Sequence, residues 1–559
     1  MVSTSSSWWE ESVIYQIYPP TFADANGDGI GDLQGIIQRL DYLNDGHPHA
    51  SLSLGIDAIW LSPIFASPMG DNGYDVSDYY RINPMYGTLA DLDELIAAAH
   101  QRRIKLILDL VLNHTSQEHE WFRTSSASQN NEKADWYLWQ DPAEDGGVPN
   151  NWRSYMGGTG WTFHEARQQY YFHTFKSFQP DLNWRNPAVR AAIADIVRFW
   201  LNRGVDGFRL DASSVYSKDQ GFRDNPMKFT SVDPEAYDSY HHLYEKDLPE
   251  NHHIIREIRG ILEEYGDRVL IGETFINSKL NESIMFYGVQ NDELHLPFEF
   301  EFPFSPWHPG YLQQQIEKKE VLTPPGAWPV YFLDNHDIPR HLSRWIACSL
   351  CTDPATVAQG AAALLLTLRG TPILYYGQEI GMENHEEIPP DLRQDRAMIK
   401  GNDEDERSTR DGARTPMQWD DSPQAGFSFG EAVDPWLPVH PNYKDVNVAK
   451  QQSNPDSIFD FYRRLLQVRR QTPALRCGEW RSLIHYPDDL LAYLRRHETD
   501  QVLVIINFTQ ERLFCVDEPL EPSRWRVLVS NCRQAGTEMA TLDSLKAFEV
   551  SVFQRMEAG

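Results

Sequence analysis

The sequence predicts an α/β fold: a (β/α)8 TIM barrel with a domain inserted after the third strand and an antiparallel β-domain at the C-terminus. Short apolar runs alternate with longer amphipathic stretches from residue 13 to about residue 380, a pattern typical of βαβ units and a parallel sheet. Polar residues also follow several of the expected strands, at the end where TIM barrels carry their active sites. A doubly wound sheet would gather such residues at one switch point instead.

Apolar segments rich in Val, Ile, Leu and aromatic residues predict the barrel strands, because strands covered on both faces are almost continuously apolar. Stretches with helical periodicity predict helices between some of them. The strands are expected at residues 13–18, 58–64, 105–112, 207–210, 268–273, 329–334 and 372–376, and the helices at residues 89–103, 188–203 and 355–368.

Two regions depart from this alternation. Residues 115–178 follow the third strand, are rich in Trp, Asn, Gln and Gly, and are too long for a plain connection, so we expect a small inserted domain. After residue 454, a helix-like stretch leads into segments of alternating polarity, which indicate an antiparallel sheet. The predicted organisation is a barrel of residues 1–114 and 179–453, an inserted domain of residues 115–178, and a C-terminal β-sandwich of residues 454–559.

The composition narrows the classes of partner. The chain has 559 residues and a formal net charge of -31, which repels phosphate backbones and anionic lipids but leaves neutral ligands open. Neither a secretory signal nor an apolar run of bilayer length is visible. The five cysteines are scattered, and only Cys348 and Cys351 have C-x-x-C spacing. We therefore expect a cytoplasmic protein without a disulfide framework or a cysteine metal cluster.

Two carboxylates end neighbouring strands of the expected barrel. Asp211 follows the fourth strand and Glu273 ends the fifth, so their side chains should come within reach of one another. Cleavage of a glycosidic bond with retention needs two carboxyl groups about 5–5.5 Å apart, one to attack the anomeric carbon and one to exchange a proton. Arg209, two residues before Asp211 on the same strand face, would keep that carboxylate ionised. The alternative for a strand-end Asp is capping of the next helix.

Five motifs resemble the conserved regions of glycoside hydrolase family 13, the α-amylase family. The fifth has the form typical of the branch that contains oligo-1,6-glucosidases and α-glucosidases. The resemblance covers nearly the whole chain, and the motifs agree in order, spacing and strand context. They are DLVLNH (109–114), GFRLDASSV (207–215), GET (272–274), FLDNHD (332–337) and, as the fifth, QPDLNW (179–184).

This resemblance implies roles for individual residues. Asp211 would be the nucleophile, Glu273 the general acid/base, and Asp337 a third carboxylate that binds sugar hydroxyls and favours the oxocarbenium-like state. Fixed carboxylates suit this chemistry because positive charge develops in the transition state. His114 and His336 would bind hydroxyls of the glucose unit whose bond is cleaved; the alternative is a purely structural role.

Two further segments resemble the α-glucosidase branch. In GYDVSDY (73–79), Tyr74 would stack on the sugar ring, unless it is only a core aromatic, and Asp75 would bind hydroxyls of the terminal glucose. RDGARTPMQW (410–419) supplies Arg410 as the expected partner of Asp75. Such an ion pair would close the pocket behind one glucose and make the enzyme exo-acting. Other arginines considered for the site are Arg414, if the register of this motif is shifted, and Arg340.

The segment DANGDGIGD (24–32) places oxygen-bearing residues at alternating positions, as at the start of an EF-hand loop with Gly29 at the turn. Gly35 stands where the bidentate Glu would be. The resemblance nevertheless implies one structural Ca²⁺ (or Mg²⁺), and the alternative is an Asp/Asn/Gly-rich turn without a metal. The expected ligands are Asp24, Asn26, Asp28, the backbone carbonyl of Ile30, and Asp32.

Ala212 bears on the linkage. In the oligo-1,6-glucosidase branch a valine after the nucleophile goes with α-1,6 cleavage and a smaller residue or threonine with α-1,4, so Ala212 favours maltose-like substrates and leaves sucrose open. The predicted function is a retaining exo-acting α-glucosidase for small α-glucosides or oligosaccharides, with transglucosylation as a side reaction. Alternatives are a trehalose synthase, a sucrose isomerase (whose arginine-rich segment is missing from residues 298–330), and a catalytically silent sugar-binding relative.

Overall fold

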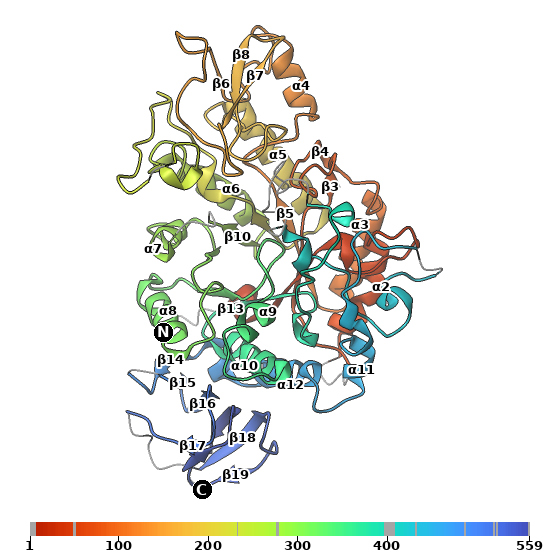
Figure 1. The fold of residues 1–559 in the computed structure, drawn as a ribbon, viewed down its shortest axis with the longest axis vertical. Coiled ribbons are helices and arrows are strands. Elements are labelled where there is room, and N and C mark those ends of the chain that lie inside the picture. Colours follow the sequence, from red (N-terminus) through yellow and green to blue (C-terminus); the bar gives the residue numbers. More distant parts are fainter. Residues whose placement is uncertain are drawn as a thin grey trace.

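The barrel consists of eight parallel strands in one sheet with helices around it (Figure 1). The strand order is β11-β10-β9-β5-β2-β1-β13-β12, which confirms the predicted fold class. The strands are β1 (Ile14–Ile17), β2 (Ala58–Leu61), β5 (Lys105–Leu110), β9 (Gly207–Leu210), β10 (Val269–Glu273), β11 (Leu296–Phe298), β12 (Val330–Phe332) and β13 (Thr371–Tyr375). The computed structural model describes residues 7–47, 52–231, 233–274, 279–395, 409–430, 433–485, 488–517, 520 and 524–556.

The barrel closes by hydrogen bonds between β1 and its two neighbours and by side-chain packing between β11 and β12. Ile14 of β1 lies opposite both Ala58 of β2 and Ile373 of β13. The rings of Phe298 and Phe332 pack with their centroids 5.1 Å apart. Strand β11 was not among the predicted strands, because three residues give no periodic signal of their own. The equally short β12 was predicted only because it lies within the longer apolar segment 329–334.

Alternate strand residues supply two cores, as the period of two in a strand requires. Trp60, Ile107 and Ile271 belong to the cluster inside the barrel. Their neighbours Ile59 and Leu270 belong to the larger cluster that the surrounding helices cover. The strands are therefore buried on both faces, which explains their nearly continuous apolar character.

Helix α5 (Pro187–Arg203) shows why these stretches form helices. Asn186 caps its first turn, proline occupies the first helical position, and Gly204 ends it with a φ of 103°, the left-handed conformation that glycine favours. The other helices are α1 (Trp8–Glu11), α2 (Leu33–Leu43), α3 (Leu89–Gln101), α4 (Glu120–Ala127), α6 (Pro249–Glu263), α7 (Leu280–Ser283), α8 (Pro309–Leu322), α9 (His341–Ile346), α10 (Pro354–Thr367), α11 (Val448–Gln452), α12 (Ile458–Gln471) and α13 (Pro473–Cys477). Among the described residues, no helix has both the length and the apolar character that crossing a membrane needs.

The chain leaves the barrel after β5 and forms a small region of its own at the top of Figure 1. It contains α4 and an antiparallel sheet in the order β6-β8-β7. Phe122 of α4 packs against Trp139 and Tyr171 of this sheet, with ring centroids 5.6 and 5.1 Å away. The predicted insertion after the third strand is confirmed. Its strands are β6 (Trp139–Gln140), β7 (Trp161–His164) and β8 (Gln169–Phe172); a hairpin of β3 (Phe65–Ala66) and β4 (Asp78–Ile82) follows β2.

The C-terminal part is an antiparallel sheet of six strands with a two-stranded ribbon, β17–β20. Tyr493 and Val504 face the helices of the barrel, whereas Ala492 and Leu503 belong to a separate cluster that includes Leu545 of the ribbon. The predicted antiparallel β-domain is confirmed. Its strands are β14 (Glu479–Ser482), β15 (Leu490–His497), β16 (Asp500–Asn507), β17 (Arg512–Leu513), β18 (Trp525–Ser530), β19 (Glu538–Met539), β20 (Ser544–Leu545) and β21 (Val550–Arg555).

Candidate active site

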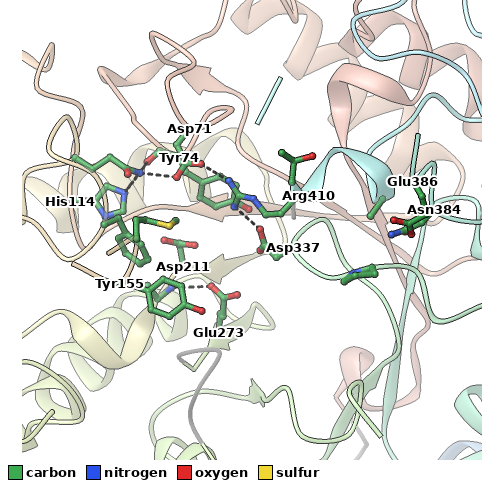
Figure 2. A pocket seen from close by; sticks show the side chains of 17 residues that line it. Asp71, Tyr74, His114, Tyr155, Asp211, Glu273, Asp337, Asn384, Glu386 and Arg410 are labelled. Atoms are coloured by element: carbon green, nitrogen blue, oxygen red, sulfur yellow. Dashed lines mark hydrogen bonds and ion pairs between the residues drawn. The ribbon is translucent and has the colours of Figure 1, made fainter. Parts of the chain in front are cut away.

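A cavity of about 380 Å³ lies at the C-terminal ends of the barrel strands (Figure 2), a size that suits a small ligand. His114 follows β5, Asp211 follows β9, Glu273 ends β10 and Asp337 follows β12. The fold thus brings together side chains that are far apart in the sequence. The lining residues are Asp71, Tyr74, His114, Tyr155, Met156, Phe175, Gln179, Asp211, Ala212, Glu273, Asp337, Pro339, Asn384, Glu386, Thr409, Arg410 and Ala413.

Arg209 binds three carboxylates next to the cavity. Its fully buried guanidinium donates to Asp109 at 2.8 Å and to Asp211 Oδ1 at 2.8 Å, and it forms an ion pair with Glu273 Oε2 at 2.5 Å. Arg209 reaches Asp211 because residues i and i+2 share a strand face, and it lies opposite Asp109 in the register of β5 and β9. One cation therefore holds the strand-end carboxylates of three adjacent strands, β5, β9 and β10.

The protein environment shifts the pKa values of Asp211 and Glu273 to different extents. Burial raises the pKa of Glu273 well above its ordinary value, and the charge of Asp211 adds to this against the opposing effect of Arg209. Burial also raises the pKa of Asp211, but there both Arg209 and His114 oppose it. The N–H of Ala212 donates to Glu273 Oε2 at 3.3 Å, so the two groups are adjacent. The pKa of Glu273 is thus raised further than that of Asp211, so Glu273 is the member of the pair that holds a proton more readily.

Tyr74 and His336 form a stacked pair beside these carboxylates. Their ring centroids are 5.3 Å apart at an interplanar angle of 4°, and the Tyr74 hydroxyl lies 2.5 Å from His336 Nε2. Burial lowers the pKa of His336 well below its ordinary value, so the ring is neutral. The Gln16 amide donates to Nδ1 at 2.8 Å, so the single ring proton sits on Nε2. Nε2 faces the Tyr74 hydroxyl and lies 3.1 Å from Asp337 Oδ2. His336 thereby orients two residues that line the cavity.

The insert is tied to the barrel beside His114. His114 Nε2 lies 2.9 Å from the carbonyl of Tyr74 and 3.1 Å from the Gln179 amide nitrogen. Lys218, which is buried, forms an ion pair with Asp181 at 2.7 Å and donates to Asn113 at 2.9 Å. These contacts join the end of the insert, the loop after β5 and the loop after β9.

Arg410 binds a second set of three carboxylates on another side of the cavity (Figure 2). Its Nη1 donates to Asp337 Oδ1 at 2.9 Å and its Nη2 to Asp71 Oδ1 at 2.8 Å. Its Nε and Nη2 donate to the two oxygens of Asp395 at 2.9 and 2.7 Å. This guanidinium joins three loops.

The pKa of Asp337, one of the carboxylates of this second set, is lowered, so Asp337 is ionised. Burial alone would raise its pKa, but His336, Arg410 and Arg414 lower it below the ordinary value. Arg414 donates to Asp337 Oδ1 at 3.2 Å and to the carbonyl of His336 at 2.7 Å, so the alternative arginine contacts the site as well. Arg340 is fully buried and donates to a backbone carbonyl at 2.8 Å; it is not among the lining residues.

The predicted ion pair between Asp75 and Arg410 is wrong, because Asp71 takes that place. Asp75 is buried and accepts hydrogen bonds from the Ser67 hydroxyl and from the N–H groups of Gly70 and Asp71, at 2.9–3.0 Å. The two residues after Asp71 have φ values of 51° and 101°, so the chain reverses between the two aspartates. Asp75 shapes this turn, and Asp71 faces the cavity.

Several lining residues carry no signal that the sequence analysis used. Tyr155 and Phe175 come from the insert, and Asn384 and Glu386 come from the region after β13. The position of the insert after the third strand could have indicated that it contributes residues to the cavity, since such insertions usually border the active site. Which of its aromatic residues face inward depends on packing.

Segment 24–32 forms a turn held by its own side chains. Both oxygens of Asp24 accept backbone N–H groups at 2.7 and 2.9 Å, Asp28 accepts from Ile30 at 2.9 Å, and Asp32 caps α2. The donor atoms are oxygens, as Ca²⁺ prefers, and Asn26 and Asp28 are exposed. Over the described ranges, no three His, Cys, Asp or Glu side chains are grouped as a metal site, so a cation here would also need amide or carbonyl oxygens.

Eight parallel strands with the strand-end carboxylates of Asp211, Glu273 and Asp337 on one cavity are the arrangement of a barrel glycoside hydrolase. The family described as the alpha amylase catalytic domain matches residues 16–478. A probable alpha-glucosidase of Rhizobium meliloti (strain 1021) is 40% identical over 91% of this chain and 91% of that protein. An oligo-1,6-glucosidase of Bacillus cereus is 36% identical over 98% and 99%. The chain belongs to the α-amylase family, glycoside hydrolase family 13.

A solved structure extends the similarity to the whole fold. The trehalulose synthase MutB from Pseudomonas mesoacidophila MX-45 is 34% identical and superimposes with a TM-score of 0.86 over 99% of this chain and 100% of that chain. An inactive variant of MutB has been solved in complex with isomaltulose, so relatives of this chain bind small sugars. Together these similarities make the protein a retaining glycoside hydrolase of the α-glucosidase group.

Proposed function

We propose that the protein is an exo-acting α-glucosidase that removes one terminal glucose from short α-glucosides, with a preference for α-1,4 bonds. The observation that carries this proposal is the pair of charge clusters on one small cavity. Arg209 holds Asp211 and Glu273, and Arg410 holds Asp71 and Asp337. The first cluster suits bond cleavage, and the second suits recognition of a single sugar unit.

In the first step, Glu273 gives its proton to the glycosidic oxygen while Asp211 attacks the anomeric carbon. The bond between that carbon and the glycosidic oxygen breaks, the aglycone leaves as an alcohol, and a glucosyl ester forms on Asp211. Arg209 donates to Asp211 Oδ1, so Oδ2 makes the attack. The raised pKa of Glu273 keeps it protonated at the start of the reaction.

In the second step, Glu273 is a carboxylate and takes a proton from water. The water oxygen bonds to the anomeric carbon, the ester bond to Asp211 breaks, and the glucose leaves with its original α configuration. A sugar hydroxyl in place of water would give transglucosylation. The same residues therefore serve hydrolysis and transfer, and the acceptor decides the outcome.

Recognition of the glucose falls to residues around the cleavage pair. Asp337 and Asp71 would accept hydrogen bonds from sugar hydroxyls while Arg410 and His114 donate, and Tyr74 would stack on the ring. Asp75, which the sequence analysis gave this role, is engaged in its own turn. Bonds that strengthen as charge develops at the anomeric carbon favour the transition state over the bound substrate.

The linkage preference rests on Ala212, which lines the cavity directly after Asp211. A small side chain there leaves more room next to the cleaved bond than the valine of α-1,6-specific enzymes. A product profile across maltose, isomaltose, sucrose and trehalose tests the proposal. We expect α-glucose as the first product and faster turnover of maltose than of isomaltose; faster turnover of isomaltose would contradict the linkage.

Isomerisation by glucosyl transfer is the second candidate, and the similarity to a trehalulose synthase favours it. It shares the glucosyl ester on Asp211 and differs only in the acceptor. The same product profile separates the two. Isomaltulose, trehalulose or trehalose as the main product would replace hydrolysis with isomerisation.

We also propose that segment 24–32 holds one Ca²⁺ (or Mg²⁺) through Asp24, Asn26, Asp28, Asp32 and the carbonyl of Ile30. Its all-oxygen donor set supports this. Chelation should then lower the melting temperature by a few degrees, roughly what loss of a bound ion costs, and elemental analysis should find one metal per chain. An unchanged melting temperature with no metal found would leave a turn without an ion.

A matched pair of variants tests the same proposal. Asp28→Ala should abolish the effect of chelation. Asp145→Ala should not, although Asp145 is exposed and accepts the N–H of Gly147 at 2.9 Å just as Asp28 accepts that of Ile30. Equal behaviour of both variants would contradict a metal site.

We further propose the cytoplasm as the compartment. All five cysteines lie in the described residues and are unpaired, which suits a reducing environment. Fractionation of the source cells followed by an α-glucosidase assay tests this; activity in the secreted fraction would contradict it.

A further inference from the structure

Of the three carboxylates around Arg410, Asp71 and Asp337 line the cavity, and Asp395 does not. Asp395 is fully buried, with no exposed surface. It therefore has no way to contact a bound sugar. Its position next to Arg410 needs another explanation than direct recognition.

Asp395 takes one whole edge of the Arg410 guanidinium. Its Oδ2 accepts from the backbone N–H and from Nε of Arg410, both at 2.9 Å, and its Oδ1 accepts from Nη2 at 2.7 Å. The guanidinium is planar with its five N–H groups in a fixed geometry. Fixing one edge therefore fixes the direction in which Nη1 meets Asp337 and Nη2 meets Asp71.

Asp395 is in turn held by a contact that does not involve the Arg410 side chain. Asp411, which is buried, accepts from the N–H groups of Gln394 and Asp395 at 2.9 and 3.1 Å through Oδ2. The two carboxylates thus join residues 394–395 to residues 410–411 reciprocally. The backbone of Asp395 is therefore held by a contact that is independent of the Arg410 side chain.

The ionisation of Asp395 is consistent with its hydrogen bonds to the Arg410 guanidinium. Burial would raise the pKa of Asp395, but the guanidinium of Arg410 outweighs burial and lowers it below its ordinary value. Asp395 is thus ionised, and its bonds to Arg410 are charge-assisted, the stronger class of hydrogen bond.

We propose that Asp395 is a positioning residue for substrate recognition: it sets the orientation in which Arg410 presents its Nη1 and Nη2 to Asp337, Asp71 and the terminal glucose. The inference rests on the proposed α-glucosidase function. Without Asp395 the arginine still meets two carboxylates but is free to take other rotamers, so the ordering has to occur on binding. Binding of the glucose unit weakens more than the chemical step does.

The test is Asp395→Asn, which keeps the size and removes the charge. We expect the KM for maltose and the inhibition constant for glucose to rise roughly tenfold, the effect of losing one charge-assisted bond, while kcat falls less than about threefold. Asp395→Glu, which keeps the charge, should lie between the variant and the wild type. An unchanged KM and inhibition constant in a folded Asp395→Asn variant would overturn the proposal.

Asp206→Asn is the control for a merely structural effect. Asp206 is also a buried, ion-paired aspartate, bound to Lys105 at 2.9 Å and His100 at 2.7 Å, but it precedes β9 at the other end of the barrel. This variant should lower the melting temperature and leave the KM unchanged. If it raised the KM as much as Asp395→Asn does, the positioning role would be refuted.

A double-mutant cycle shows whether Asp395 acts through Arg410. In the Arg410→Lys background, Asp395→Asn should change the KM by less than about twofold, because the planar edge it organises is already gone. Effects that multiply would mean that Asp395 acts independently, and would overturn the proposal.

Calorimetric titration with glucose separates this proposal from the proposed function. It measures binding at the cavity without turnover. A wild type that binds glucose but releases none from any α-glucoside would refute the function, while weaker glucose binding by Asp395→Asn would still support the positioning role. Equal glucose affinity of the two proteins would refute the positioning role whatever the activity.

Discussion

Two arginines organise the cavity, and each binds three carboxylates. Arg209 joins Asp109, Asp211 and Glu273; Arg410 joins the carboxylates of Asp71, Asp337 and Asp395. The partners of Arg209 lie on neighbouring strands, whereas those of Arg410 lie on three loops. An arginine that binds three carboxylates therefore occurs twice, once at the barrel strands and once among the loops.

The two clusters also differ in protonation. Next to Arg209, burial raises the pKa of Asp109 to about 7 and that of Glu273 well above its ordinary value. Next to Arg410, the pKa values of Asp337 and Asp395 are lowered despite burial. The carboxylates around Arg209 (Asp109, Asp211 and Glu273, the strand cluster) therefore favour holding a proton. Among those around Arg410 (Asp71, Asp337 and Asp395, the loop cluster), Asp337 and Asp395 keep their negative charges. This difference supports the proposed division of roles, with proton transfer and bond cleavage at the strand cluster and sugar binding at the loop cluster.

The largest expected effect is that of Asp211→Asn in the strand cluster. Removing the nucleophile should lower kcat at least about 10⁴-fold, with the melting temperature changed by only a few degrees because the side chain keeps its size. Asp71→Asn in the loop cluster should mainly raise the KM. Assays with p-nitrophenyl α-glucoside check both; near-normal kcat in Asp211→Asn would remove it from the nucleophile role.

Exchanging each arginine for lysine compares the clusters directly. Lysine keeps the charge but not the planar donors. Arg209→Lys leaves buried carboxylates unpaired, so we expect kcat to fall roughly 10²–10³-fold and the free energy of unfolding to drop by about 3–5 kcal/mol. Arg410→Lys should raise the KM about 10- to 100-fold with a smaller loss of kcat. Steady-state kinetics and denaturant unfolding give both quantities, and the reverse pattern would contradict the division of roles.

The pH dependence should come from the strand cluster alone. Glu273 has a raised pKa, so its proton is present at low pH and lost as the pH rises through that value; kcat/KM should fall on the basic side. Asp211 also has a raised pKa, so protonation on acidification gives the acid side of a bell-shaped profile. Arg410→Lys should lower the curve without moving either limb. A shifted basic limb in that variant would show that the clusters are electrostatically coupled.

The smallest effect is expected from Ala212→Val. Valine next to the nucleophile should raise the ratio of isomaltose to maltose turnover a few-fold, since one or two methyl groups in a pocket discriminate by about 1–3 kcal/mol at most. Ala212 has a φ of 42°, a conformation that β-branched residues disfavour, so the variant should also be less stable. Competition assays measure the ratio; an unchanged ratio would separate linkage preference from this residue.

The strand cluster was largely predictable, and the loop cluster was not. Arg209, Asp211 and Glu273 follow from strand periodicity and from the rule that neighbouring strands of a barrel end side by side. Arg410 was found through its motif, but its partner was placed at Asp75, because sequence spacing does not show that a turn with two positive φ values separates Asp75 from Asp71. Asp395 belongs to no motif, so only its contacts reveal it.

Local periodicity and burial encode the alternation of strands and helices, the insertion after the third strand and the residues at the strand ends, so these features could be predicted from the amino-acid order. Three other features became visible only in the folded chain: which side chains of the loops and of the insert face the cavity, where the three-residue strand β11 lies, and which carboxylates share a cation. Those features depend on contacts between segments up to hundreds of residues apart, such as Asp71 with Arg410, and local sequence carries no record of them.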